Sequence, residues 1–171
     1  MTPRARKRRV TPAATVARLP PFERVVALHG PAVLRFCAAQ AGVQRAEDCF
    51  QETMISALRA YDAVRDAGAI RPWLFAIAAR KAIDAHRQQA WAPTPIEDVA
   101  EVAGAEELRP RDEALWAQVR ALPVKQREAV TLRFAGDLSH GEIATLMGSS
   151  EAAARRNVFE GLRRLRRDAE R

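Results

Sequence analysis

Two turn signals precede an arginine-rich segment near the carboxyl end of the chain. Ser139 and Glu142 have the spacing of a capping box, in which each side chain satisfies a backbone N–H at the start of a helix. Gly148 suits the left-handed stop of that helix, and Ser149 or Ser150 can cap the next one. Two helices joined by a tight turn, the second of them basic, are typical of a helix-turn-helix, whose second helix lies in the major groove of DNA.

The first turns of the second helix carry the side chains expected to contact DNA. Arginine pairs well with guanine and asparagine with adenine, and further arginines suit phosphates. The predicted DNA-binding residues here are Ser150, Glu151, Arg155, Arg156 and Asn157. A solvated basic helix in an ordinary bundle is the alternative, but the coincidence of capping box, glycine turn and arginines favours DNA binding.

A second stretch combines an aromatic ring with basic side chains, a combination suited to single-stranded nucleic acid because rings stack on bases and cations hold the backbone. The candidates are Arg71, Trp73, Arg80, Lys81, Asp84 and Arg87. Trp73 beside Leu74 and Ile77 is also typical of plain helix core. From composition alone, packing of Trp73 into the helix core is favoured over a role in binding nucleic acid.

Acidic and polar side chains form one face of the helix expected over residues 45–61, within an otherwise basic protein. They are Asp48, Gln51, Glu52 and Thr53. Solvated helix surface is the default explanation. A protein-docking face is the alternative, because DNA would repel an acidic patch.

Enzymatic motifs and metal sites are not predicted. The sequence has no phosphate-cradling glycine loop and no nucleophile elbow, and its three histidines lack metal-ligand spacing. Cys37 and Cys49 fall within apolar helical patterns, which favours buried thiols over a disulfide or a zinc site. We therefore expect no catalysis, no metal and no cofactor.

The elements that would position these side chains are helical. Apolar residues recur at three- and four-residue intervals from the start of the first helix, with a break expected at Gly30-Pro31. Leu58 belongs to the predicted apolar stripe of residues 45–61, and a third helix should start near Pro72. Further helices are expected up to Pro123, over 124–134, and in the helix-turn-helix, with no stretch of β periodicity.

This pattern predicts an all-α fold with two small helical domains. Their expected ranges, with a basic disordered arm before them and an acidic, proline-containing flexible linker between them, are 1–21 for the arm, 22–91, 92–110 for the linker, and 111–171. A net charge of +7 favours a polyanionic partner. No apolar run approaches the roughly 20 residues that span a bilayer, so we expect a cytoplasmic protein without membrane insertion.

Two groups of motifs resemble the extracytoplasmic-function (ECF) sigma factors of bacterial RNA polymerase. The sequence AEDCFQET at 46–53, with RPWLFAIA at 71–78 and KAID at 81–84, is similar to the family's second conserved region. LPVKQREAV at 122–130, followed by Ser139, EIA at 142–144 and Gly148, is similar to its fourth region. Both occur in the family's order, over almost all of residues 22–167.

The resemblance implies a transcription initiation factor that binds core RNA polymerase and promoter DNA. Asp48, Gln51 and Glu52 would dock on the clamp of the largest polymerase subunit. The loop over residues 62–70 and the helix after it would melt the minus-ten element. The helix-turn-helix would bind the minus-thirty-five element while its domain packs against the flap of the second-largest subunit, and such factors usually have an inhibitory anti-sigma partner.

Departures from the family pattern and two alternatives accompany this interpretation. Arg80 stands where the family often has Asn, and AAARRN at 152–157 where it often has GTVKSR, so no promoter consensus is transferred.

A stand-alone helix-turn-helix repressor would use its first domain to dimerise and would bind palindromic duplex without polymerase. A regulatory adaptor would only sequester a partner, and would not need Arg155 and Arg156.

Overall fold

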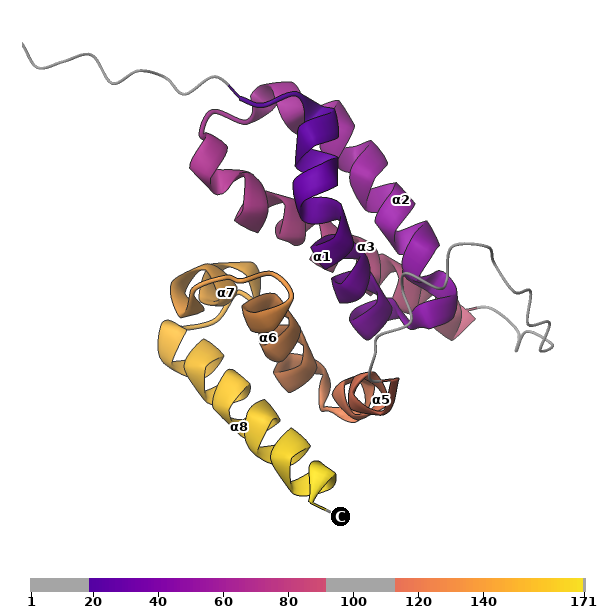
Figure 1. Cartoon of the computed structure of the whole chain (residues 1–171), viewed down its shortest axis with the longest axis vertical. Coiled ribbons are helices and arrows are strands. Elements are labelled where there is room, and N and C mark those ends of the chain that lie inside the picture. The colour runs from indigo at the N-terminus through magenta and orange to yellow at the C-terminus, as the bar shows by residue number, and fades with distance from the viewer. Residues whose placement is uncertain (1–18, 92–112, 171) are drawn as a thin grey trace, which may run out of the picture.

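The structure, a computed structural model, describes residues 19–91 and 113–170 (Figure 1). Its helices fall into an amino half and a carboxyl half. The amino half holds α1 (Phe22–Ala41), α2 (Val43–Ala60), two short 3-10 turns (Tyr61–Ala63 and Ala67–Ala69) and α3 (Ile70–Trp91); the carboxyl half holds α5 (Glu113–Ala121), α6 (Val124–Phe134), α7 (His140–Leu146) and α8 (Glu151–Ala169).

The predicted all-α class is confirmed, because the described residues contain no strand. The predicted linker and most of the predicted arm lie outside the described residues. The domain boundaries proposed from the sequence stay a prediction. None of the helices described is long and apolar enough to cross a membrane.

α1 is one continuous helix through Gly30 and Pro31, so the predicted break is wrong. Pro31 removes one backbone donor, which normally kinks or ends a helix. Packing against the neighbouring helix offsets this loss, since Gly30 is buried and a Cβ there would lie 3.6 Å from the Phe50 ring. Tertiary contacts of this kind contribute most of the stability of helices in proteins.

Among the described residues, one cluster of buried apolar side chains extends through both halves. The Phe36 and Phe75 rings of the amino half meet edge to face at 5.5 Å and are fully buried. Leu132 and Leu138 of the carboxyl half belong to the same cluster of buried side chains. The two helix groups are therefore in direct contact, with α6 and α7 lying beside α1 and α3 (Figure 1).

Candidate nucleic-acid and polymerase interfaces

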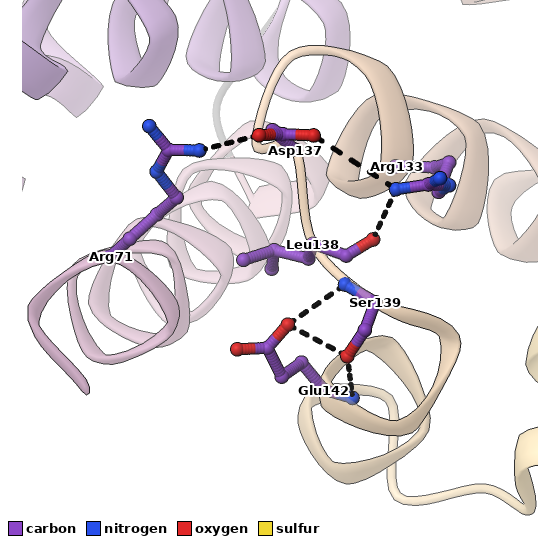
Figure 2. A network of polar contacts seen from close by, with 6 residues as sticks. All are labelled: Arg71, Arg133, Asp137, Leu138, Ser139 and Glu142. Carbon is purple, nitrogen blue, oxygen red and sulfur yellow. Dashed lines mark hydrogen bonds and ion pairs between the residues drawn. The ribbon is translucent and has the colours of Figure 1, made fainter. Parts of the chain in front are cut away.

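The capping box predicted before α7 is present. The Ser139 backbone N–H donates to Glu142 Oε2 at 2.8 Å, and the Glu142 N–H donates to Ser139 Oγ at 3.3 Å (Figure 2). Gly148 takes a φ of +58°, as the left-handed stop requires. Ser150 caps α8, its Oγ accepting from the Ala153 N–H at 3.2 Å. These local contacts fix the turn between the two helices.

The amino-terminal turns of α8 present basic side chains to solvent. Arg155 and Arg156 are exposed, and Arg155 forms an ion pair of 2.8 Å with Glu151 one turn earlier. Asn157 is half-buried, and its amide donates to the Ala153 carbonyl at 3.0 Å. The two arginines are thus placed to meet DNA, whereas the Asn157 amide contacts its own helix.

Phe159 is a surface residue of α8 that the sequence reasoning missed. It is 64% exposed, and it follows Arg155 and Arg156 at four- and three-residue spacing. Residues at this spacing are neighbours on a helix surface. The helical pattern contained the signal, because Phe159 falls outside the stripe that Ala154 and Val158 bury.

Some of the residues predicted to bind polymerase (Asp48 and Glu52) and some of those predicted to bind DNA (Lys81, Asp84 and Arg87) line one cleft between α2 and α3. Lys81 Nζ of α3 lies 3.1 Å from Glu52 Oε2 of α2. The cleft has a volume of about 750 Å³ and is lined by Arg45, Asp48, Cys49, Glu52, Lys81, Asp84, Ala85 and Arg87. The sequence treated these as two separate sites because helical spacing does not show which helices pair.

The exposed face of α2 differs from the predicted one at Thr53 and Leu58, and it also includes Ile55. Thr53 is buried, and its hydroxyl donates to the Cys49 carbonyl at 2.7 Å, so it does not belong to the face. Leu58, placed in the apolar stripe by the sequence, is 58% exposed, and Ile55 is 46% exposed. Asp48, Gln51 and Glu52 are exposed as predicted. The surface is therefore acidic at one end and apolar at the other.

α3 presents its predicted DNA-binding residues in two different environments. Arg80, Asp84 and Arg87 are exposed. Trp73 is half-buried, with its ring centroid 6.2 Å from that of Tyr61, so it contributes to the core as the structural interpretation required. Arg71 contacts the carboxyl half, where its Nη1 lies 2.9 Å from Asp137 Oδ2 (Figure 2).

The two cysteines are buried free thiols, as predicted. A hydrogen bond to Cys49, together with burial, raises the pKa of Cys37, so this thiol stays protonated. The same hydrogen bond lowers the pKa of Cys49. Within residues 19–91 and 113–170, no group of three or more His, Cys, Asp or Glu side chains is arranged to hold a metal ion.

An apolar groove that the sequence reasoning did not identify lies between α5, α6 and α8. Its volume is about 500 Å³, and its lining includes Leu115, Trp116, Val119, Val130, Phe134, Leu162 and Leu165. Phe134 is 63% exposed there. The helices approach closely at Gly161, where a Cβ would lie 2.6 Å from the Val130 side chain.

Family models match both halves of the chain. The model described as Sigma-70 region 2 matches residues 25–92, and Sigma-70, region 4 matches residues 112–165. The ECF RNA polymerase sigma factor SigD of Mycobacterium tuberculosis is 35% identical over 152 residues, covering 80% of this chain and 71% of SigD. The RNA polymerase sigma factor CarQ of Myxococcus xanthus is 34% identical over 154 residues, covering 85% and 87%.

Solved structures also resemble this chain. The sigma factor RpoE in complex with the anti-sigma factor NepR from Bartonella quintana has a TM-score of 0.68 and 25% identity, over 85% of this chain and 94% of RpoE. CnrH in complex with the cytosolic domain of CnrY shares the fold, with a TM-score of 0.63, 23% identity and 87% of each chain covered. Because the matches include region 2 as well as the helix-turn-helix, a stand-alone repressor is not favoured. The chain belongs to the ECF sigma factors, the transcription initiation factors that bind bacterial RNA polymerase and promoter DNA.

Proposed function

We propose that this chain binds core polymerase through α2, the minus-ten element through α3 and the minus-thirty-five element through α8. The observation that carries the proposal is the charge separation between exposed faces. The exposed part of α2 is acidic in a chain of net charge +7, whereas the start of α8 exposes two adjacent arginines. Opposite charges on separate faces suit two partners of different charge.

The polymerase face consists of Asp48, Gln51 and Glu52, extended by Ile55 and Leu58. Exposed apolar side chains beside polar ones are typical of protein interfaces, whose centre is apolar and whose rim is polar. The occupant is the clamp of the largest subunit, as the family resemblance implies. Lys81, paired with Glu52 across the cleft, joins this face to the DNA-binding helix.

The minus-ten face is formed by α3 and the turns before it. Arg80 and Arg87 supply positive charge for phosphates, and Lys81 adds to it at the cleft. Arg71, Trp73 and Asp84 complete the proposed set. Trp73 acts chiefly by holding the start of α3 against Tyr61.

The minus-thirty-five face is the start of α8, with base contacts from Arg155 and Arg156. Ser150 caps the helix, and Glu151 orients Arg155 through their ion pair. Asn157 positions the second turn, and Phe159 adds an apolar contact of the kind that suits a thymine methyl group.

We assign the apolar groove between α5, α6 and α8 to the flap of the second-largest polymerase subunit. The groove residues on α8 are Leu162, Leu165 and Arg166, well beyond the base-contacting turn. Bound flap and bound DNA would therefore not compete. A helix that lays an apolar face into a groove is a common recognition mode.

The family assignment also guides what we propose for partners and place of action. Sigma factors are non-enzymatic, and we propose that this chain catalyses nothing and acts in the cytoplasm together with polymerase. RpoE was solved in complex with the anti-sigma factor NepR. On that basis we propose an anti-sigma partner for this chain too.

Run-off transcription tests the assignment of α2. Core polymerase and DNA from upstream of the protein's own gene are combined with wild type, with a Gln51→Ala, Glu52→Ala double variant, or with Glu23→Ala, which removes an exposed carboxylate at the start of α1. We expect initiation with wild type and Glu23→Ala and a large loss with the double variant. Initiation by the double variant at wild-type level would contradict the docking face.

A further inference from the structure

The two cysteines of the chain lie together where α1 packs against α2. Cys37 is on α1 and Cys49 on α2, and the two thiols share a hydrogen bond. The sequence contains no third cysteine. Neither thiol takes part in the contacts with polymerase and DNA proposed above.

The two thiols differ in their access to solvent. Cys49 lines the cleft of about 750 Å³ between α2 and α3, although only 4% of the residue is exposed. Cys37 is 0% exposed and does not line this cleft. A small oxidant that enters the cleft would therefore meet Cys49 first.

The surroundings of Cys49 favour its thiolate, which is the reactive form of a cysteine. The hydrogen bond from Cys37 lowers the pKa of Cys49 most, and the positive charge of Lys81 also lowers it, whereas burial opposes both. Lys81 lines the same cleft, with its Nζ 3.1 Å from Glu52 Oε2. A thiolate at a cleft with a second, protonated thiol beside it is the arrangement that redox-sensing cysteines use.

We propose that Cys49 and Cys37 form an oxidation site for hydrogen peroxide, and that the resulting disulfide weakens docking of α2 on core polymerase. The Cys49 thiolate attacks one peroxide oxygen and the O–O bond breaks. The hydroxide that leaves takes up the proton released by the Cys49 thiol, giving water and a sulfenic acid on Cys49. The Cys37 sulfur then attacks the Cys49 sulfur, the S–O bond breaks, and the departing oxygen takes the Cys37 proton to form a second water. Two thiols are thereby oxidised to one disulfide while both peroxide oxygens are reduced, and exchange with reducing thiols restores the pair.

A disulfide at this point would displace the polymerase face, a consequence that rests on the proposed function of α2. An S–S bond of about 2.05 Å is shorter than any hydrogen bond, so α1 and α2 must move together where the thiols meet. Asp48 directly precedes Cys49, and Glu52 follows within one helical turn. Bond formation therefore shifts two residues of the polymerase face.

Intact-mass spectrometry of the reduced full-length chain tests the oxidation without polymerase. Hydrogen peroxide should remove about 2 Da, the two thiol hydrogens, and should block alkylation of both cysteines until dithiothreitol is added. Because the chain has two cysteines, an intramolecular disulfide identifies the pair without any variant. Cys37→Ala should stop at a sulfenic acid on Cys49 that dimedone traps, whereas Cys49→Ala should leave Cys37 unmodified at the same dose. Circular dichroism checks that both variants fold.

The rate of disulfide formation tests the activation of Cys49. Lys81→Gln should slow it at least about twofold, because the positive charge that favours the thiolate is lost. Lys125→Gln, at an exposed position of α6, changes the net charge equally and should react at the wild-type rate. Equal rates in the two variants would contradict activation of Cys49 at the cleft.

Affinity for core polymerase tests the consequence for docking. Oxidised wild type should bind core at least about tenfold more weakly than reduced wild type, and dithiothreitol should restore the affinity. Peroxide-treated Cys49→Ala is the control for oxidation elsewhere and should bind as the untreated variant does. Thiols that stay reduced in the folded chain but react in urea, or a disulfide that leaves core affinity unchanged, would overturn the proposal. Failure of reduced wild type to bind core would instead count against the proposed function, since disulfide formation is measured without polymerase.

Discussion

The helix-turn-helix and the junction of the two halves are held together over very different distances along the chain. Ser139 and Glu142 of the capping box are three residues apart, and Arg155 and Glu151 are four. At the junction, Gln40 and Thr131 are 91 residues apart. A DNA-binding element built from local contacts is already specified by its own segment, whereas a junction built from distant ones exists only in the folded chain.

The largest expected effect comes from the shared core. Phe75→Ala should lower the free energy of unfolding by about 3–5 kcal/mol, because it removes a fully buried ring that contacts Phe36. Urea unfolding measures this change, with Phe159→Ala as the exposed control, expected within about 0.5 kcal/mol of wild type. Amide hydrogen exchange should then be faster in α6 as well as α3. Faster exchange in the amino half alone would show that the halves unfold independently.

The second prediction concerns the locally built DNA-binding face. Arg156→Ala should weaken promoter binding by the polymerase-bound protein by about 1–3 kcal/mol, the usual loss for a base-contacting arginine. Arg167→Ala, near the end of the same helix and also exposed, is the matched control. Fluorescence anisotropy at one fixed salt concentration compares the two. Equal losses would mean that α8 contributes only general positive charge.

The third prediction concerns the helix cap that Ser139 provides at the start of α7. Ser139→Ala removes the acceptor of the Glu142 N–H and should cost about 1 kcal/mol of stability. Ser149→Ala, in the exposed turn but one residue before the α8 cap, should change stability little. Thermal unfolding monitored by circular dichroism measures both. A loss in Ser149→Ala as large as in Ser139→Ala would indicate that the turn is stabilised by something other than capping.

This contrast also explains what could be predicted from the sequence. The cap at Ser139, a cap at Ser149 or Ser150, and the stop at Gly148 were predicted because each depends on residues within one turn of helix, and the structure selects Ser150. The break at Gly30-Pro31 was wrongly predicted because packing against Phe50 lies outside any local window.

The candidate sites likewise divide into features set within one helix and features set by contacts between distant segments. Exposure of Arg155 and Arg156 follows from the periodicity of a single helix. The shared α2–α3 cleft, with Lys81 against Glu52, depends on which helices pair, and the occupation of Arg71 by Asp137 depends on contact between the halves. Neither arrangement has a signature in local spacing.

The smallest expected effect is a pH dependence at His29 of α1, whose charge is affected by Arg71 of α3. Burial, and then the positive charge of Arg71, lowers the pKa of His29 below its ordinary value of 6.5. The unfolded chain therefore binds more protons than the folded chain between the lowered pKa and 6.5, so the free energy of unfolding should fall as the pH drops through this window. Urea unfolding at several pH values should show a shallower dependence for His29→Gln than for wild type. Identical profiles would mean that His29 titrates alike in both states, and that neither burial nor the charge of Arg71 lowers its pKa in the folded chain.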